Sequence, residues 1–141
     1  MNWMMPETVP ESPYPLFYFK YSLYICGMVK DFIQYTEALE LKQLGFDEPC
    51  FGVYATKDGY VRKSAYDENG DAPTYSQAFR FFREKYGIGS WIHHYFDMDK
   101  GTFIYSYVLT LPHRGEEYVY DTHEEAELAC LKRLIEIVKN K

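Results

Sequence analysis

The chain has 141 residues, of which 47% are hydrophobic and 26% are charged, and its formal net charge is -6. This size and composition predict one globular domain that buries a substantial core. The negative charge argues against a general attraction to nucleic-acid phosphates or to anionic lipid, although it leaves room for a local basic patch. Aromatic residues make up 19% of the chain, which is far above ordinary usage and suits half-buried sheet surfaces and interfaces.

The first 28 residues contain two unlike segments. Residues 1–15 are rich in proline and have little periodicity, so we expect an extended tail. Leu16 to Met28 is apolar and aromatic, but Lys20 interrupts it, and it is too short for a membrane-spanning helix. It also lacks the basic leader and cleavage site of a signal peptide. We interpret residues 1–27 as an N-terminal extension, which leaves two alternatives open: an extra strand, or a segment upstream of a true start at Met28.

The next part of the chain predicts one helix and a hairpin. A helix is expected from Gln34 onward and should end at Gly45, because glycine readily adopts the left-handed conformation that closes a helix. The segments Cys50 to Thr56 and Tyr60 to Ala65 are strand-like and are joined by a turn composition. The polar stretch Tyr66 to Pro73 is predicted to be a surface loop.

A second helix should begin at Thr74, because Thr74 and Gln77 have the spacing of a capping box. Gly87 is expected to end this helix. The apolar stripe at helical spacing consists of Tyr75, Ala78, Phe79, Phe82 and Tyr86. The basic residues Arg80, Arg83 and Lys85 fall outside it.

Beyond Gly87 the apolar pattern changes to a period of two. The segments Trp91 to Phe96, Thr102 to Leu111 and Glu117 to Tyr120 are rich in aromatic and β-branched residues and are separated by turn compositions. We predict three antiparallel strands, which need helices to cover one face.

The last helix is predicted to follow Thr122, which forms a second capping-box spacing with Glu125. Its broad apolar face is made by Ala126, Cys130, Leu131, Leu134, Ile137 and Val138. The helix should therefore dock by one side. We expect Leu134→Asp to unfold the protein and Lys132→Asp to be nearly silent.

Together these elements predict an α+β fold. Three amphipathic helices pack on an antiparallel sheet of about five strands, and the C-terminal half has the order α-β-β-β-α. Residues 28–141 should form a single domain, with a further division into 28–73 and 74–141 left open. A weak repeat supports that division, because Tyr35 to Leu39 and Tyr75 to Phe79 share a pattern.

Three segments carry a resemblance to a known group of proteins: Ala38 to Cys50, Tyr75 to Gly87 and Thr122 to Val138. They resemble a family of small uncharacterised proteins that gut Bacteroidales, their phages and their mobile elements encode. The resemblance implies a phage or mobile-element setting and no particular activity. Members of that family tend to begin near the position of Met28.

The order helix, three strands, helix is also similar to that of the double-stranded-RNA-binding domain. That family grips phosphates with lysines at the start of its second helix. This chain instead has Glu124, Glu125 and Glu127 there, and carboxylates repel a phosphate backbone. The resemblance therefore implies a shared topology without the RNA-binding function.

The side chains that could carry chemistry are scattered. His93, His94, His113 and His123 could in principle bind a metal with Asp97 or Asp99. Adjacent histidines on a strand point to opposite faces, however, so His93 and His94 cannot share one site. The cysteines Cys26, Cys50 and Cys130 form no paired motif, which is typical of reduced thiols in a cytoplasmic protein. We expect no catalytic residue, metal or cofactor.

The aromatic strands are the candidate functional feature. Phe103, Tyr105 and Tyr107 share one face of the longest strand, and the other face is also apolar. Aromatic residues are enriched at the cores of interfaces. The candidate interaction surface comprises Tyr95, Phe103, Tyr105, Tyr107 and Tyr118. The alternative is that other parts of the chain cover this face.

The leading hypothesis is a non-enzymatic phage or mobile-element protein that binds a host or phage protein, as an inhibitor or regulator. A homodimer is a further option, and we expect no membrane partner. A second hypothesis is a nucleic-acid-binding module that uses Arg80, Arg83 and Lys85. A third is an enzyme whose site has an unfamiliar pattern.

Overall fold

The computed structural model describes residues 29–50, 52–54, 61–62, 70–110 and 118–141. The elements in chain order are the 3-10 helix η1 (Val29–Asp31), helix α2 (Tyr35–Gln43), strands β1 (Gly52–Tyr54), β2 (Val61–Arg62) and β3 (Asp71–Ala72), helix α3 (Tyr75–Tyr86), strands β4 (Ser90–Asp97) and β5 (Thr102–Leu109), and helix α4 (His123–Lys139). The predicted α+β class and the three α-helices are confirmed.

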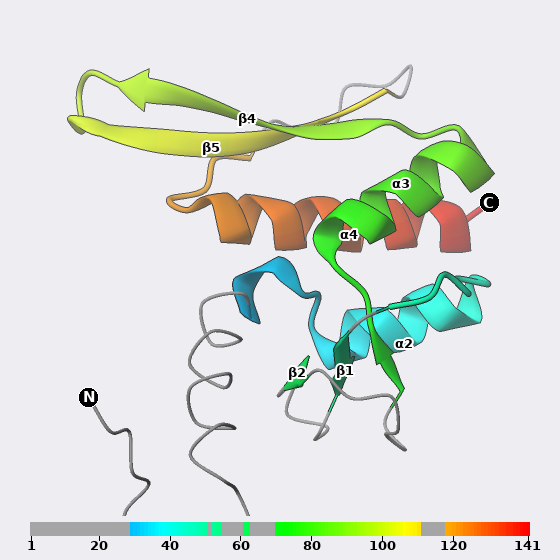
Figure 1. Cartoon of the computed structure of the whole chain (residues 1–141). Helices are drawn as coiled ribbons and strands as arrows, with labels where there is room; N and C mark the ends of the chain where they lie inside the picture. The colour runs from blue at the N-terminus through cyan, green and yellow to red at the C-terminus, as the bar shows by residue number, and fades with distance from the viewer. Residues whose placement is uncertain (1–28, 51, 55–60, 63–69, 111–117) are drawn as a thin grey trace, which may run out of the picture.

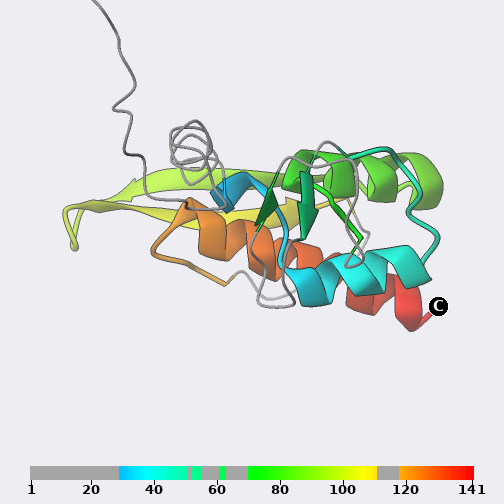
Figure 2. The same ribbon diagram turned by 60° about the horizontal axis from the view of Figure 1, so that its bottom comes forward.

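Helices occupy the middle of the molecule. Figure 1 shows the β4–β5 hairpin on one side of α3 and α4, with α2 and β1 on the other side. Figure 2 shows α2 running beside the C-terminal part of α4. Two ion pairs join these helices, Lys132–Glu37 at 3.7 Å and Lys139–Glu40 at 3.0 Å.

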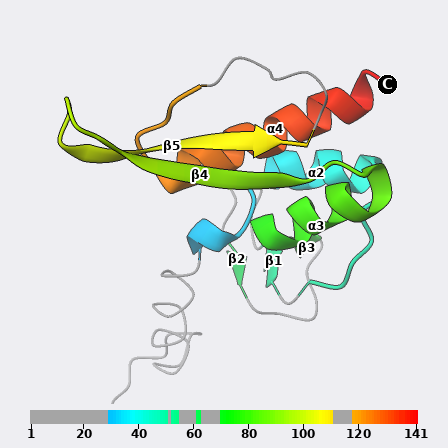
Figure 3. The ribbon, with the colours of Figure 1, turned by 90° about the horizontal axis from the view of Figure 1, so that it is seen from above.

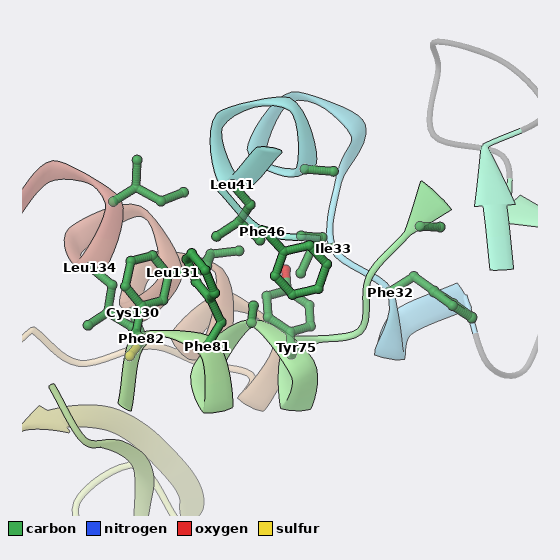
Figure 4. Packing of buried hydrophobic residues seen from close by; sticks show 14 of the residues in the cluster. Phe32, Ile33, Leu41, Phe46, Tyr75, Phe81, Phe82, Cys130, Leu131 and Leu134 are labelled. Atoms are coloured by element: carbon green, nitrogen blue, oxygen red, sulfur yellow. The ribbon is translucent and has the colours of Figure 1, made fainter. Parts of the chain in front are cut away.

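The hydrophobic core lies where the three α-helices meet (Figure 4). Leu41 from α2, Phe82 from α3 and Leu131 from α4 are completely buried. Tyr54 of β1 is also buried, and its hydroxyl donates a hydrogen bond of 2.5 Å to the carbonyl of Ile33. This bond ties the small sheet to the segment that precedes α2.

The helix ends follow the local sequence signals. Thr74 caps α3 with its side chain while the Gln77 side chain accepts from the Thr74 amide, which is the reciprocal pair predicted. Gly87 closes α3 with a positive φ of 68°, a conformation that costs glycine little. Thr122 caps α4 by accepting from the amide of Glu125 at 3.2 Å, which is one of the two hydrogen bonds of the predicted capping box. These ends need no distant partner, which explains why the sequence predicted them well.

The predicted face of α4 is also confirmed. Ala126, Cys130, Leu131 and Leu134 are buried, and Ile137 and Val138 pack against the core with partial exposure. Ile135, which was not among the residues predicted for this face, is buried as well.

The single sheet of about five strands is wrong for the described residues. Their five strands form two antiparallel sheets, one in the order β2-β1-β3 and one of β4 and β5. The helices separate the two sheets (Figure 1). The chain leaves β3 at Pro73, which has no N–H to continue a ladder, and passes directly into α3. The end of the predicted surface loop is therefore a strand, in which Ala72 is fully buried.

Of the predicted strand Glu117 to Tyr120, the described residues form a single isolated β-bridge. Tyr120 pairs with Tyr105, and the two residues exchange backbone hydrogen bonds of 2.9 and 2.8 Å. Glu117, where the prediction placed the start of this strand, lies outside the described residues, as do residues 1–27 and the predicted turn at residues 57–59. The order α3, β4, β5, α4 is observed.

Candidate functional site

The β4–β5 hairpin has one face turned toward the helices and one turned away. Ile92, Tyr107 and Leu109 lie on the inner face and pack against the core. The register places His94 opposite Tyr105 and Phe96 opposite Phe103 on the same inner face, farther along the hairpin. Because no described helix reaches that far, Phe96 and Phe103 are 47% and 54% exposed. Figure 1 shows this end of the hairpin extending past the start of α4.

The exposed end of the hairpin is held in one conformation by its turn. The Asp97 carboxylate accepts from the amides of Asp99 at 2.9 Å and Lys100 at 3.2 Å, and the Asp97 carbonyl accepts from Gly101 at 2.8 Å. Phe96 and Phe103 meet edge to face with ring centroids 5.3 Å apart. Contacts within the hairpin itself therefore order the turn and the aromatic pair.

We call the exposed residues at this end the distal hairpin surface: His94, Tyr95, Phe96, Met98 and Phe103. Met98, in the turn, is 83% exposed. Tyr95 lies on the outer face of β4, 38% exposed, so the surface wraps around the end of the hairpin. Large apolar side chains that are this exposed and this close together are uncommon on a monomer and mark interaction sites.

The five predicted surface residues do not form one patch. Tyr95 and Phe103 belong to the distal hairpin surface. Tyr105 is half-buried and meets His123 of α4 edge to face at 5.9 Å. Tyr107 is half-buried and stacks on Tyr120 at 6.3 Å, and Tyr118 is 55% exposed.

The sequence pattern did not predict Phe96 and Met98 as members of the exposed surface. Phe96 could have been found, because a tight turn over residues 97–101 sets it opposite Phe103. Met98 follows no strand periodicity, so only the structure reveals its exposure.

Tyr107 and Tyr118 instead line a shallow groove between the hairpin and α4, of about 440 Å³. Its lining residues are Tyr107, Tyr118, Tyr120, Ala129, Lys132, Arg133 and Glu136. Burial raises the pKa of Tyr107, and the neighbouring Tyr120 adds to the shift, so this phenol stays protonated at neutral pH. Both cations of the groove have carboxylate partners, because Arg133 pairs with Glu136 at 2.5 Å and Lys132 with Glu37.

Two of the three basic residues of α3, Arg80 and Lys85, contact the connection between α2 and β1. Arg80 is ion-paired with Glu48, and the Lys85 amine donates to the carbonyl of Leu44 at 2.8 Å. Lys85 also stands 5.2 Å from the centre of the Phe81 ring. The contacts with Glu48 and Leu44 link α3 to the connection between α2 and β1, whereas the contact with Phe81 lies within α3. Arg83 is exposed on the same helix.

His93 and His94 lie on opposite faces of β4, as adjacent positions on a strand predict. His93 faces outward opposite Ser106, and His94 faces inward opposite Tyr105. His123 pairs with Glu127 at 3.6 Å, and His113 lies outside the described residues. Within the described part of the chain, no three His, Cys, Asp or Glu side chains are grouped as metal ligands.

The two described cysteines are poorly suited to act as nucleophiles. Burial raises the pKa of the Cys50 thiol to about 11, and the nearby Asp71 carboxylate adds to the shift. Burial likewise raises the pKa of Cys130 to about 12. Both thiols are therefore protonated at neutral pH, whereas a nucleophilic cysteine needs its thiolate.

None of the described helices has the length and apolarity that crossing a bilayer requires. Comparison of the whole chain with protein families, with curated proteins and with solved structures found no match.

Proposed function

We propose that this protein acts by binding another protein through the distal hairpin surface. The observation that carries the proposal is the exposure of Phe96, Met98 and Phe103 on an ordered hairpin that extends beyond the helices. Each half-exposed phenylalanine would remove on the order of 100 Å² of apolar surface from water on binding, which is worth about 2 kcal/mol. A few such residues supply most of the affinity of a typical interface.

Two features favour a protein partner over a small molecule or a nucleic acid. The surface projects outward, whereas small molecules are usually bound in clefts that bury most of their area. The charges at the hairpin turn are mixed, because Asp97 and Asp99 accompany Lys100. A nucleic acid would need a positive patch instead. The nucleic-acid alternative is further weakened because Arg80 and Lys85 already bind other parts of the chain.

The resemblance to proteins of phages and mobile elements suggests the identity of the partner. We propose a host or phage protein whose activity is altered when the aromatic hairpin docks on it. An inhibitor or regulator needs no catalytic site of its own, and a preorganised aromatic pair lowers the entropy lost on binding.

The test begins with a photo-crosslinking amino acid at Phe103, in host lysate, and with the same amino acid at Gln43 as a control. Gln43 is exposed at the end of α2, on the side of the helices away from the hairpin. A protein captured from position 103 alone is then purified, and its affinity for the unmodified chain is measured directly.

The decisive comparison uses Phe96→Ser with Phe103→Ser. This double variant should weaken binding at least about 100-fold, since two buried rings at about 2 kcal/mol each are lost. Thr102→Ser, on the same strand, should bind as the unmodified chain does. Equal affinity of the double variant and the unmodified chain, with unchanged circular dichroism, would refute the proposal.

A further inference from the structure

Strand β4 has an open edge among the described strands. It pairs only with β5, and β5 lies between β4 and the segment that contains Tyr120 (Figure 3). Backbone hydrogen bonds of an antiparallel pair alternate along each strand. Thr110 donates to the Gly89 carbonyl, and Tyr105 directs its backbone groups to Tyr120, away from β4. The backbone groups of the even-numbered residues of β4 therefore point toward the open edge: Ser90, Ile92, His94 and Phe96.

This edge lacks the features that normally protect an exposed strand. Its eight residues contain no proline, and none of them is Lys, Arg or Glu. The single Asp97 stands at the end of the strand. The register with β5 is continuous over all eight pairs, so no bulge twists the edge away. A long edge with so little charge is a template for another strand.

A second copy of β4 fits this edge. Two antiparallel copies related by a twofold axis place one residue opposite itself, and residues equally distant from it opposite each other. With His93 on the axis, Ile92 lies opposite His94 of the second copy and Ser90 lies opposite Phe96. All four residues that point to the edge then find partners within β4. An axis at any other residue of β4 would leave at least one of them opposite a residue outside the strand.

The side chains and charges agree with this register. Trp91 lies opposite Tyr95 of the second copy, on the outer face, where these side chains are 49% and 38% exposed. Aromatic pairs across neighbouring strands stabilise a sheet. Asp97 lies four residues from the axis, so the two Asp97 carboxylates are about 27 Å apart, well beyond the screening length of about 8 Å. The contact therefore brings no like charges together.

The area is sufficient for a specific contact of moderate strength. Trp91, Tyr95 and Phe96 are each partly exposed, with on the order of 100 Å² of accessible surface apiece. These side chains from two chains, together with the backbone edges, approach the roughly 1,000 Å² that a weak specific interface buries. Both copies use the same edge, so the contact closes at two chains and does not propagate into a fibre.

We propose that two copies of this chain pair antiparallel along β4, with His93 on the twofold axis, and join their hairpins in one continuous sheet. The pairing goes beyond the proposed function and does not depend on it. It uses the backbone edge of β4, whereas Met98 of the turn and Phe103 of β5 lie outside the paired edge.

The first test is disulfide trapping of the full chain. On the axis, opposed residues form a pair without hydrogen bonds whose Cα atoms are about 4.5 Å apart, within the range of about 4.4–6.8 Å that a disulfide spans. His93→Cys should therefore give a covalent dimer under mild oxidation. Tyr95→Cys is the matched control on the same strand and face, because its two copies would lie about 14 Å apart. Both variants carry the same native cysteines. Equal crosslinking of the two variants, or none from His93→Cys, overturns the proposal.

The second test is sedimentation velocity of the full chain from about 5 to about 500 μM, where we expect a dimer whose fraction rises with concentration. His93→Lys should weaken the dimer about tenfold, because it sets two like charges directly opposite each other. Thr102→Lys adds the same charge at an exposed position of β5, away from the edge, and should leave the dimer unchanged. A monomer at every concentration, or a dimer that His93→Lys does not weaken, overturns the proposal.

Discussion

Lys132→Asp is the substitution for which sequence and structure predict different outcomes. Sequence periodicity places Lys132 on the solvent side of α4, which predicts a nearly silent change. In the structure its amine lies 3.7 Å from the carboxylate of Glu37, whose side chain is only 10% exposed. The Glu37 carboxylate also accepts a hydrogen bond of 2.7 Å from the hydroxyl of Thr36. The substitution would remove a cation and bring a second negative charge near a buried carboxylate.

The magnitude lies between two limits. Exposed ion pairs contribute about 0–1 kcal/mol, and removing one member of a fully buried pair costs about 3–5 kcal/mol. The Lys132 side chain is 58% exposed, so solvent screens the pair in part, and we expect a loss of about 2 kcal/mol in the free energy of unfolding. For a chain of this size that is a fall of about 4–8 °C in Tm.

A matched control lies on the same helix. Lys139 pairs with Glu40 of α2 at 3.0 Å, but both side chains are more than two-fifths exposed. Lys139→Asp should therefore cost less than about 1 kcal/mol. Urea unfolding of both variants, monitored by circular dichroism, measures the difference. Equal losses would refute the view that the burial of Glu37 decides the outcome, as would a Glu37→Gln substitution that fails to rescue Lys132→Asp.

Three further outcomes follow from single side chains. Leu134→Asp should unfold the protein, because an unpaired charge would replace a completely buried side chain at a cost of several kcal/mol, and a calorimetric scan without a cooperative transition is the expected result. Thr74→Ala should lower the free energy of unfolding, measured by urea titration, by about 1 kcal/mol, because it removes the side chain that caps α3. Ser76→Ala, two residues later at an exposed position, should change this free energy little. Cys50 should react slowly with a thiol-specific disulfide reagent at pH 7, and its rate should rise about tenfold per pH unit toward pH 11, because a raised pKa keeps the thiol protonated below that value. A rate that is already constant between pH 7 and pH 9 would contradict the raised pKa.

The sequence by itself determined the helices of this protein. The cap at Thr74, the glycine end at Gly87 and the apolar face around Leu134 all depend on residues within one or two turns of each other. Such signals depend only on residues that are close in sequence, so they can be recognised without knowing the tertiary structure. The same holds for the β4–β5 hairpin, because its two strands alternate in pattern and are joined by a short turn.

Only the tertiary structure decided how these elements are layered and which charges are structural. The strands near β1 could have joined the aromatic hairpin, but the direct passage from β3 into α3 sets the helices between them. Lys85 and Lys132 have the sequence setting of ordinary surface lysines, yet each is held by a group more than 40 positions away in the chain. Pattern along one element cannot reveal such partners, because contacts between distant residues depend on packing.

The candidate site was likewise predicted in part by the sequence and decided in part by the tertiary structure. Aromatic content and the period of two predicted the aromatic strands. They did not decide whether the aromatic side chains are exposed or buried. The length of the hairpin relative to α4 decided it: Tyr107 lies over the helix and is half-buried, whereas Phe103, four residues closer to the turn, extends past the helix and is exposed. Exposure depends on where a neighbouring element begins, which no single strand encodes.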